Sequence, residues 1–106
     1  MSSKTTMLVI NENPEYQAIY KDFFDKHGYK VFTAQDTKGI LDLISEEKIE
    51  VVLIGFKHPP TINTPLIKLF IDIKDFDQRV EVVLIAPHFP QEIAVKAVKL
   101  GATDCI

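Results

Sequence analysis

Three side chains in this sequence could bind a metal ion or accept a phosphoryl group, and each lies shortly after an apolar run. Glu12 follows the run 7–10, His58 follows the run 51–54, and His88 follows the run 82–85. A carboxylate and two imidazoles suit a transition metal, and an imidazole nitrogen can itself receive a phosphoryl group. The two histidines stand in separate segments without a neighbouring ligand, however. The pattern therefore favours solvated histidines over a metal site.

The sequence offers no other group of residues with the spacing of a catalytic centre. It contains no Ser/His/Asp set, no glycine-rich phosphate loop and no metal-spaced pair of cysteines. The single cysteine, Cys105, cannot form an internal disulfide bond, and we expect it to be a buried strand residue. We expect Lys57 to be a solvated lysine. His27 is expected to be either a favourable charge at the end of a helix dipole or a packed ring. We therefore predict that the chain is not an enzyme and has no catalytic residues.

The apolar runs that precede these side chains predict the strands of a sheet. The runs 7–10, 51–54 and 82–85 consist of β-branched residues and leucine, which is typical of parallel strands buried on both faces. The segment 29–34 alternates more in polarity, which suits an edge strand. We expect strands near residues 6–10, 29–34, 50–55 and 81–86, and the opening of a fifth strand at 104–106.

Helical patterns separate these strands. Four helices are predicted. The first begins at Asn13-Pro14 and ends near Gly28, and the second begins with a cap at Asp36 and continues through Ile44. The third runs from Thr64-Pro65 to about Ile73, and the fourth from Gln91 to Leu100. The first of them should face the core with an apolar stripe that consists of Tyr16, Ile19, Tyr20, Phe23, Phe24 and His27. Such an alternation of strands and helices predicts an α/β fold with a parallel sheet and helices on both faces.

Length, composition and charge agree with one small globular domain over residues 1–106. The chain is 46% hydrophobic and 25% charged, which is ordinary for a globular protein. Its formal net charge of −3 argues against a nucleic-acid-binding surface, because such surfaces need clustered Lys and Arg. The apolar run 7–10 is too short for a signal peptide or a membrane span. We expect a cytoplasmic protein that contacts neither nucleic acid nor a membrane.

The whole chain resembles the receiver domain of bacterial response regulators. Four features carry the resemblance: residues 11–14 (Asn-Glu-Asn-Pro), residues 27–31 (His-Gly-Tyr-Lys-Val), Pro59, and residues 97–104 (Ala-Val-Lys-Leu-Gly-Ala-Thr-Asp). The resemblance implies a flavodoxin-like, doubly wound sheet of strand order 2-1-3-4-5. It also implies that the chain lacks part of the fifth strand and the whole fifth helix of that family.

The same resemblance implies a degenerate phosphorylation site. Active receivers place a phosphoryl group on an aspartate that ends strand 3, and they hold Mg²⁺ with an acidic pair after strand 1. Gly55 matches the acceptor aspartate, and Asn11 and Glu12 match the acidic pair. Ala86 matches the hydroxyl residue that ends strand 4. A glycine cannot form an acyl phosphate, and one remaining carboxylate should bind Mg²⁺ weakly.

These losses predict a pseudo-receiver: a phosphorylation-independent module of two-component signalling that binds a protein partner or an output domain. The alternative is an atypical response regulator whose pocket still binds a phosphoryl group, a small anion or a metal. That pocket would involve Asn11 and the loop residues Lys57, His58 and His88.

Two surfaces are candidates for protein contacts. The predicted helix 65–73 has more apolar residues than one core-facing stripe needs, so Ile67 and Ile71 form either an exposed partner patch or a surface that neighbouring segments cover. The absence of a fifth helix would leave an apolar strip and a sheet edge exposed. If the chain ends at Ile106, we therefore predict that it self-associates, for example as a homodimer, through that side. The alternative is that the natural protein continues and that the 106-residue fragment is simply less stable.

Overall fold

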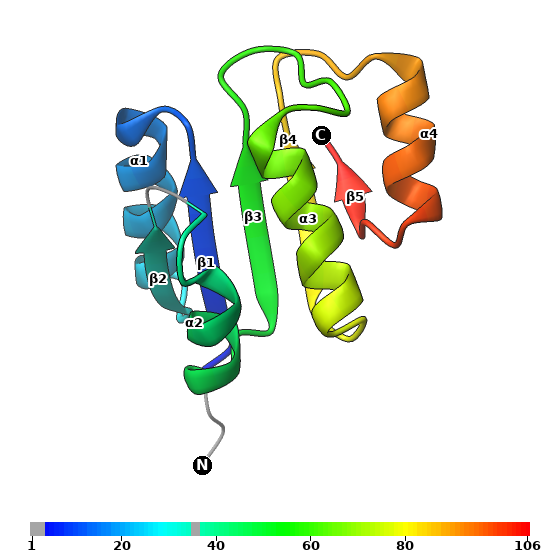
Figure 1. The fold of residues 1–106 in the computed structure, drawn as a ribbon. Helices are drawn as coiled ribbons and strands as arrows, with labels where there is room; N and C mark the ends of the chain where they lie inside the picture. Colours follow the sequence, from blue (N-terminus) through cyan, green and yellow to red (C-terminus); the bar gives the residue numbers. More distant parts are fainter. Residues whose placement is uncertain (1–3, 35–36) are drawn as a thin grey trace.

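The computed structural model describes residues 4–34 and 37–106, in which strands and helices alternate along the chain (Figure 1). The elements are β1 (Thr6–Asn11), α1 (Pro14–Lys26), β2 (Lys30–Ala34), α2 (Ile40–Glu46), β3 (Val51–Gly55), α3 (Pro65–Phe76), β4 (Glu81–Ile85), α4 (Gln91–Lys99) and β5 (Asp104–Cys105). The predicted strands and the order of elements are confirmed, including the beginning of the fifth strand.

The strands form one parallel sheet of order β2-β1-β3-β4-β5, as predicted. The three strands with continuous apolar runs, β1, β3 and β4, lie in the middle of this sheet. The register pairs Asn11 with Gly55, and Gly55 with Ile85, so the ends of these strands lie side by side. The fold is therefore the doubly wound α/β architecture that the alternation of elements predicted.

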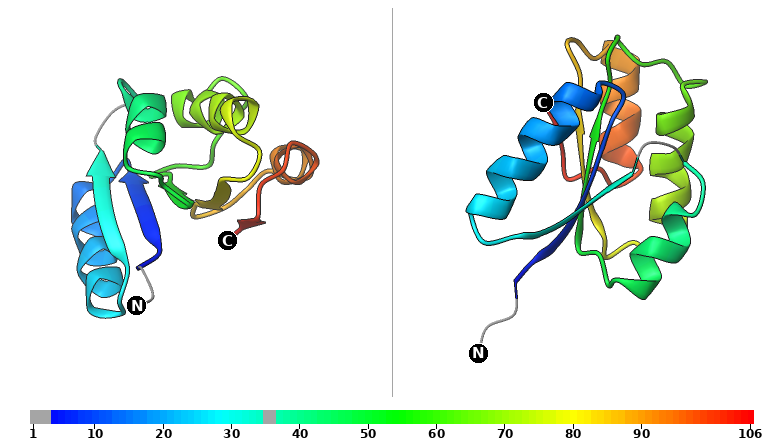
Figure 2. Two further views of the ribbon diagram at one scale, coloured as in Figure 1. Left: turned by 90° about the horizontal axis from the view of Figure 1, so that it is seen from below. Right: turned by 90° about the vertical axis from the view of Figure 1, so that its left-hand side faces the viewer.

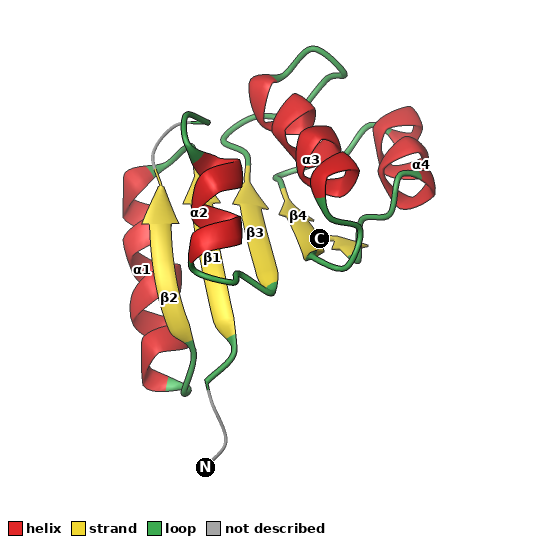
Figure 3. Ribbon diagram, turned by 60° about the horizontal axis from the view of Figure 1, so that its bottom comes forward, coloured by secondary structure: helices red, strands yellow, loops and turns green. Residues whose placement is uncertain are grey.

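Helices cover both faces of the sheet, with α1 on one face and α2, α3 and α4 on the other (Figures 2 and 3). Alternation along each strand divides the core between these two layers, because successive side chains point to opposite faces. Met7, Val9 and Leu53 belong to the cluster on the α1 face. Leu8 and Ile54 belong to the larger cluster beneath the other three helices.

Local signals set the ends of α1 as the sequence predicted. Asn13 is the N-cap, and its side-chain oxygen accepts a hydrogen bond from the Glu15 N–H at 2.9 Å, while Pro14 occupies the first turn. Gly28 has a φ of 89°, a left-handed conformation that few other residues adopt at low cost. His27 stacks on Phe23 with ring centroids 4.2 Å apart, which corresponds to the packed ring among the two roles expected at this helix end.

The start predicted for α2 is wrong. The helix begins at Ile40 after Gly39, which has a φ of 75° and provides no side-chain cap. Asp36, the predicted cap, lies outside the described residues. A left-handed glycine next to the first helical residue prevents the helix from extending back toward that aspartate.

The stripe predicted on α1 is also wrong in part. Tyr16, Ile19 and Phe23 are 57%, 59% and 50% exposed, whereas Gln17 is buried. Tyr20 and Phe24 pack against the sheet, as predicted. The helix is rotated so that Gln17, Tyr20 and Phe24, which are spaced i, i+3 and i+7, face the strands.

In the described parts of the chain, 4–34 and 37–106, no helix combines the length and the apolarity that crossing a bilayer requires.

Candidate functional site

The predicted site lies where the neighbouring strands β1, β3 and β4 end. In open α/β sheets, ligands bind beyond the carboxyl ends of the strands where the chain order reverses, which here is between β1 and β3. Asn11 and Gly55 are register partners there, and the Glu12 N–H donates to the Gly55 carbonyl oxygen at 3.1 Å. Ala86 directly follows β4, and its N–H donates to the Ile106 carbonyl oxygen at 3.1 Å. The structure thus places the degenerate positions at one end of the sheet.

The side chain of Asn11 occupies the space beside Gly55 where a larger residue would project. A Cβ atom built on Gly55 would lie 2.7 Å from the Asn11 Cγ and closer still to its Nδ2. The carboxamide is held in this orientation because its Oδ1 accepts a hydrogen bond from the Asn13 N–H at 2.8 Å. An aspartate at position 55 would therefore require Asn11 to move.

Glu12, the one carboxylate of the family's acidic pair, already has a partner across the site. Its Oε1 accepts a hydrogen bond from the Lys57 N–H at 2.8 Å. This bond links the loop after β1 to the loop after β3, although both residues are exposed. The backbone of Lys57 takes part in the site, while its side chain is the exposed lysine that we predicted.

Gln17 is a functional neighbour that the sequence analysis missed. Its side chain is 7% exposed, and its Oε1 accepts a hydrogen bond from the Asn11 N–H at 3.1 Å. The spacing of Gln17 with Tyr20 and Phe24 was the available signal, but a polar residue on a core-facing stripe was not expected. Together, Gln17, Asn13 and Lys57 fix the backbone or side chain of the two residues that match the acidic pair.

The residues at this site form a poor ligand set for Mg²⁺, the ion that the family resemblance implies. Mg²⁺ is usually bound through one or two carboxylates in near-octahedral geometry. Here Asn11 contributes an amide that is bonded to Asn13, Gly55 contributes no side chain, and the only carboxylate accepts the Lys57 N–H. Across residues 4–34 and 37–106, no three His, Cys, Asp or Glu side chains are grouped so that they could hold a metal ion.

The loop histidines do not form such a group with Glu12. His58 and His88 are both exposed, on the loops that follow β3 and β4.

Cys105 is half-buried in β5 and packs against the larger core cluster, and burial raises the pKa of its thiol. A raised pKa leaves less of the reactive thiolate near neutral pH.

The exposed partner patch on α3 is not formed. Ile67 is only 3% exposed, and Ile71 is partly buried against the same core cluster. Ile67 lines a small void together with Ile93 and Ala97 of α4, which shows that α4 covers this side of α3. Of the two outcomes left open by the sequence, the covered surface is therefore the observed one.

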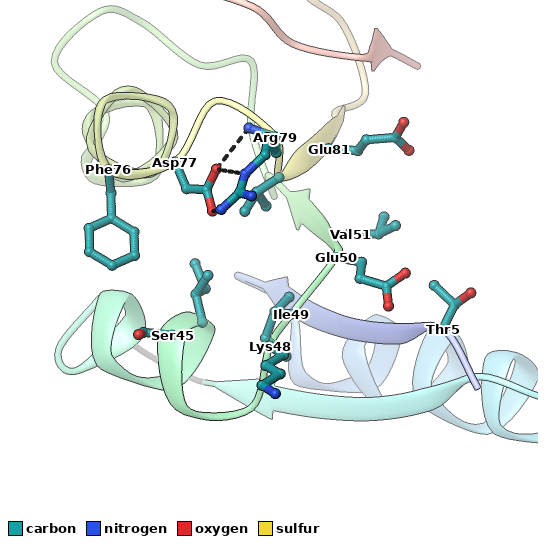
Figure 4. Close-up of a pocket in the computed structure, with 12 residues that line it drawn as sticks. Thr5, Ser45, Lys48, Ile49, Glu50, Val51, Phe76, Asp77, Arg79 and Glu81 are labelled. Atoms are coloured by element: carbon teal, nitrogen blue, oxygen red, sulfur yellow. Dashed lines mark hydrogen bonds and ion pairs between the residues drawn. The ribbon is translucent and has the colours of Figure 1, made fainter. Parts of the chain in front are cut away.

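A cavity of about 800 Å³ lies at the opposite end of the sheet, near the beginnings of β3 and β4 (Figure 4). Phe76 at the end of α3 and Ser45 of α2 lie on its two sides, and Asp77 and Arg79 are paired at its rim. The Asp77 carboxylate accepts bonds from the Arg79 backbone N–H at 2.9 Å and from its side-chain Nε at 3.1 Å. These bonds lower the pKa of Asp77 and stabilise the turn that leads into β4.

The family model of the response regulator receiver domain matches residues 7–106. Sporulation initiation phosphotransferase F of Bacillus subtilis (strain 168) is 22% identical over 96 residues, which cover 91% of this chain and 75% of that protein.

Solved structures share the fold at similarly low identity. A response regulator protein from Burkholderia pseudomallei, solved with a phosphorylated aspartic acid, a calcium ion and citrate, has a TM-score of 0.79 and 22% identity, with 96% of this chain and 58% of that chain covered. A response regulator receiver domain protein from Clostridium thermocellum has a TM-score of 0.79 and 21% identity, with coverage of 96% and 80%. At these identities the structures establish a shared fold.

Proposed function

Since the chain belongs to the response regulator receiver domain family, we propose that it acts as a receiver module whose interactions with other proteins do not depend on phosphorylation. The observation that carries this proposal is the contact between Asn11 and Gly55. The position of the acceptor has no carboxylate, and the carboxamide of Asn11 fills the space into which one would project. Phosphoryl transfer needs a nucleophile there, and none is present.

The surroundings of Gly55 support the same function. Ala86 has no hydroxyl group to bond a phosphoryl oxygen, and Glu12 is bonded to the loop of β3. The Lys57 N–H bond to Glu12 links the loops after β1 and β3, and the Asn13 N–H bond to Asn11 orients the carboxamide beside Gly55. We therefore expect this arrangement of the site not to depend on a phosphoryl group.

As a non-enzymatic module without a metal cofactor, the chain would act by binding a protein partner or an output domain in the cytoplasm. Its formal net charge of −3 supports a protein partner over nucleic acid, because phosphate contacts need clustered basic residues.

Incubation with acetyl phosphate and Mg²⁺, followed by intact-mass measurement, tests this function. We expect no mass gain for the natural chain, and none for Gly55→Asp, because Asn11 and Ala86 remain unsuited to the reaction. Beryllofluoride with Mg²⁺ should leave the amide NMR signals around Gly55 unchanged. A phosphoryl group mapped to any loop residue at the carboxyl ends of the strands would overturn the proposal, and an active receiver treated in parallel controls for the phosphodonor.

A further inference from the structure

A groove of about 920 Å³ lies between the loop that joins β3 to α3 and helix α4. Apolar side chains form much of its lining, with Pro60 and Ile62 on the loop and Val95 on the helix. Ile62 is 39% exposed and Val95 is 46% exposed, so two branched apolar side chains face solvent from opposite sides. The groove is separate from the residues around Gly55, and none of the residues in that degenerate site line it.

The charged side chains along the groove change sign from the first to the last turn of α4. Glu92 lies in the first turn of α4, whereas Lys96 and Lys99 lie in its last turn. Residues three apart on a helix share a face, so the two lysines project from the same side. The ion pairs found within residues 4–34 and 37–106 involve Lys21, Lys26 and Arg79, and neither Lys96 nor Lys99 takes part in them. A chain of negative net charge thus presents a basic rim beside an apolar groove.

We propose that this groove binds an acidic amphipathic helix of a partner protein. Apolar side chains of that helix would lie between Ile62 and Val95, and its carboxylates would contact Lys96 and Lys99. The groove has a helix and a loop as its walls and no open sheet edge, which suits a helix docked in a groove and not an added strand. The inference rests on the proposed function, because it names the chemical class of the partner for a protein-binding module.

Two synthetic peptides of the same apolar pattern test the charge requirement. One has glutamates beside leucines at helical spacing, and the other has lysines in place of those glutamates. Each is added to isotope-labelled protein without a phosphodonor, and amide NMR shifts are followed. We expect the acidic peptide to shift amides of residues 61, 62 and 91–99, and the lysine peptide to bind much more weakly.

Lys96→Glu is the informative variant, and Lys68→Glu is its matched control. Both lysines are exposed on helices, and both substitutions change the net charge equally, but Lys68 on α3 does not line the groove. Lys96→Glu should weaken binding of the acidic peptide about five- to tenfold, whereas Lys68→Glu should change it little. Each variant lies on the surface, and its amide spectrum shows whether it remains folded.

Three outcomes would overturn the inference. They are equal weakening by both variants, equal binding of the lysine peptide, and shifts that fall outside the groove. If the same amides broaden as the protein alone is concentrated, a second copy of the chain occupies the groove instead. Phosphoryl incorporation would refute the proposed function and leave the peptide result standing, so the two failures can be told apart.

Discussion

At the scale of single residues, the feature that matters most is the close approach of Asn11 to Gly55. Side chains on neighbouring parallel strands rarely tolerate an extra atom at such a contact, because protein interiors are close-packed. Gly55 is buried, and its φ does not lie in the left-handed region that favours glycine. The requirement for glycine is therefore set by the neighbour, which makes the two positions energetically coupled.

Gly55→Ala should lower the free energy of unfolding by about 1–3 kcal/mol, because the added Cβ collides with the Asn11 carboxamide. In an Asn11→Ala background, the same substitution should lower the free energy of unfolding by clearly less, since the colliding atoms are gone. Urea unfolding of the natural chain, both single variants and the double variant measures the coupling. Strict additivity of the two changes would show that Asn11 does not fill this space.

Asp77 makes the stability of the α3–β4 turn depend on pH. Hydrogen bonds from Arg79 hold the pKa of this carboxyl below its ordinary value of 3.8. A lowered folded-state pKa means that the stabilisation is present above the unfolded-state pKa and is lost as the pH falls through the folded-state pKa.

Asp77→Asn should therefore lower the urea midpoint at neutral pH, and the difference from the natural chain should shrink as the pH falls below 3.8. Asp77 is half-buried but its partner Arg79 is fully open to solvent, which screens the pair, so the difference should be small. Urea unfolding at neutral pH and at several acidic values measures it, with Asp75→Asn, an exposed carboxyl outside this pair, as the control. A difference that stays constant with pH would contradict the assignment.

At the scale of elements, the sheet-facing and the exposed face of α1 should contribute differently to the free energy of unfolding. Phe24 packs against the sheet and lies edge-to-face with Tyr29, at a centroid distance of 5.3 Å. Its neighbour Phe23 is 50% exposed and stacks on His27. The two phenylalanines are adjacent and chemically identical, so the comparison isolates the effect of orientation.

Phe24→Ala should lower the free energy of unfolding by about 2 kcal/mol, because a largely buried aromatic side chain is removed from the core. Phe23→Ala should cost less than about 1 kcal/mol, since half of its ring already faces solvent. Thermal or urea unfolding of both variants measures this. Equal losses would mean that the exposed face of α1 is covered in solution.

At the scale of the whole molecule, the two faces of the sheet are covered unequally. On its own face, α1 packs on β1 and β2, while no described helix lies over β4 and β5 there (Figure 2). Val83 and Ile85 are half-buried on this side, and Ile106 is 66% exposed. Apolar surface next to a sheet edge promotes contacts between chains.

A chain that ends at Ile106 should therefore self-associate through that side, which light scattering over a concentration series would detect, and a version extended beyond Ile106 serves as the comparison. Ile106→Glu should reduce the association. Val98→Glu, at a similarly exposed residue of α4, should not. A strictly monomeric chain with cooperative melting would rule the association out.

The sequence alone determined the order of the elements, the parallel sheet and the absence of a carboxylate at Gly55 and of a hydroxyl group at Ala86. These features depend on local patterns or on side chains that are simply missing, so no knowledge of distant neighbours was needed. The ends of α1 followed in the same way from Asn13, Pro14 and Gly28, because capping involves residues only a few positions apart.

Only the tertiary structure decided which atoms fill the degenerate site and which faces of the helices are buried. Asn11 meets Gly55, and Glu12 meets Lys57, across more than forty positions of sequence. Likewise, α4 covers Ile67, and the rotation of α1 buries Gln17 in place of Tyr16. Periodicity shows that a helix has an apolar side, but the packing of distant elements fixes where that side points, because burial is a property of neighbours and not of the residue itself.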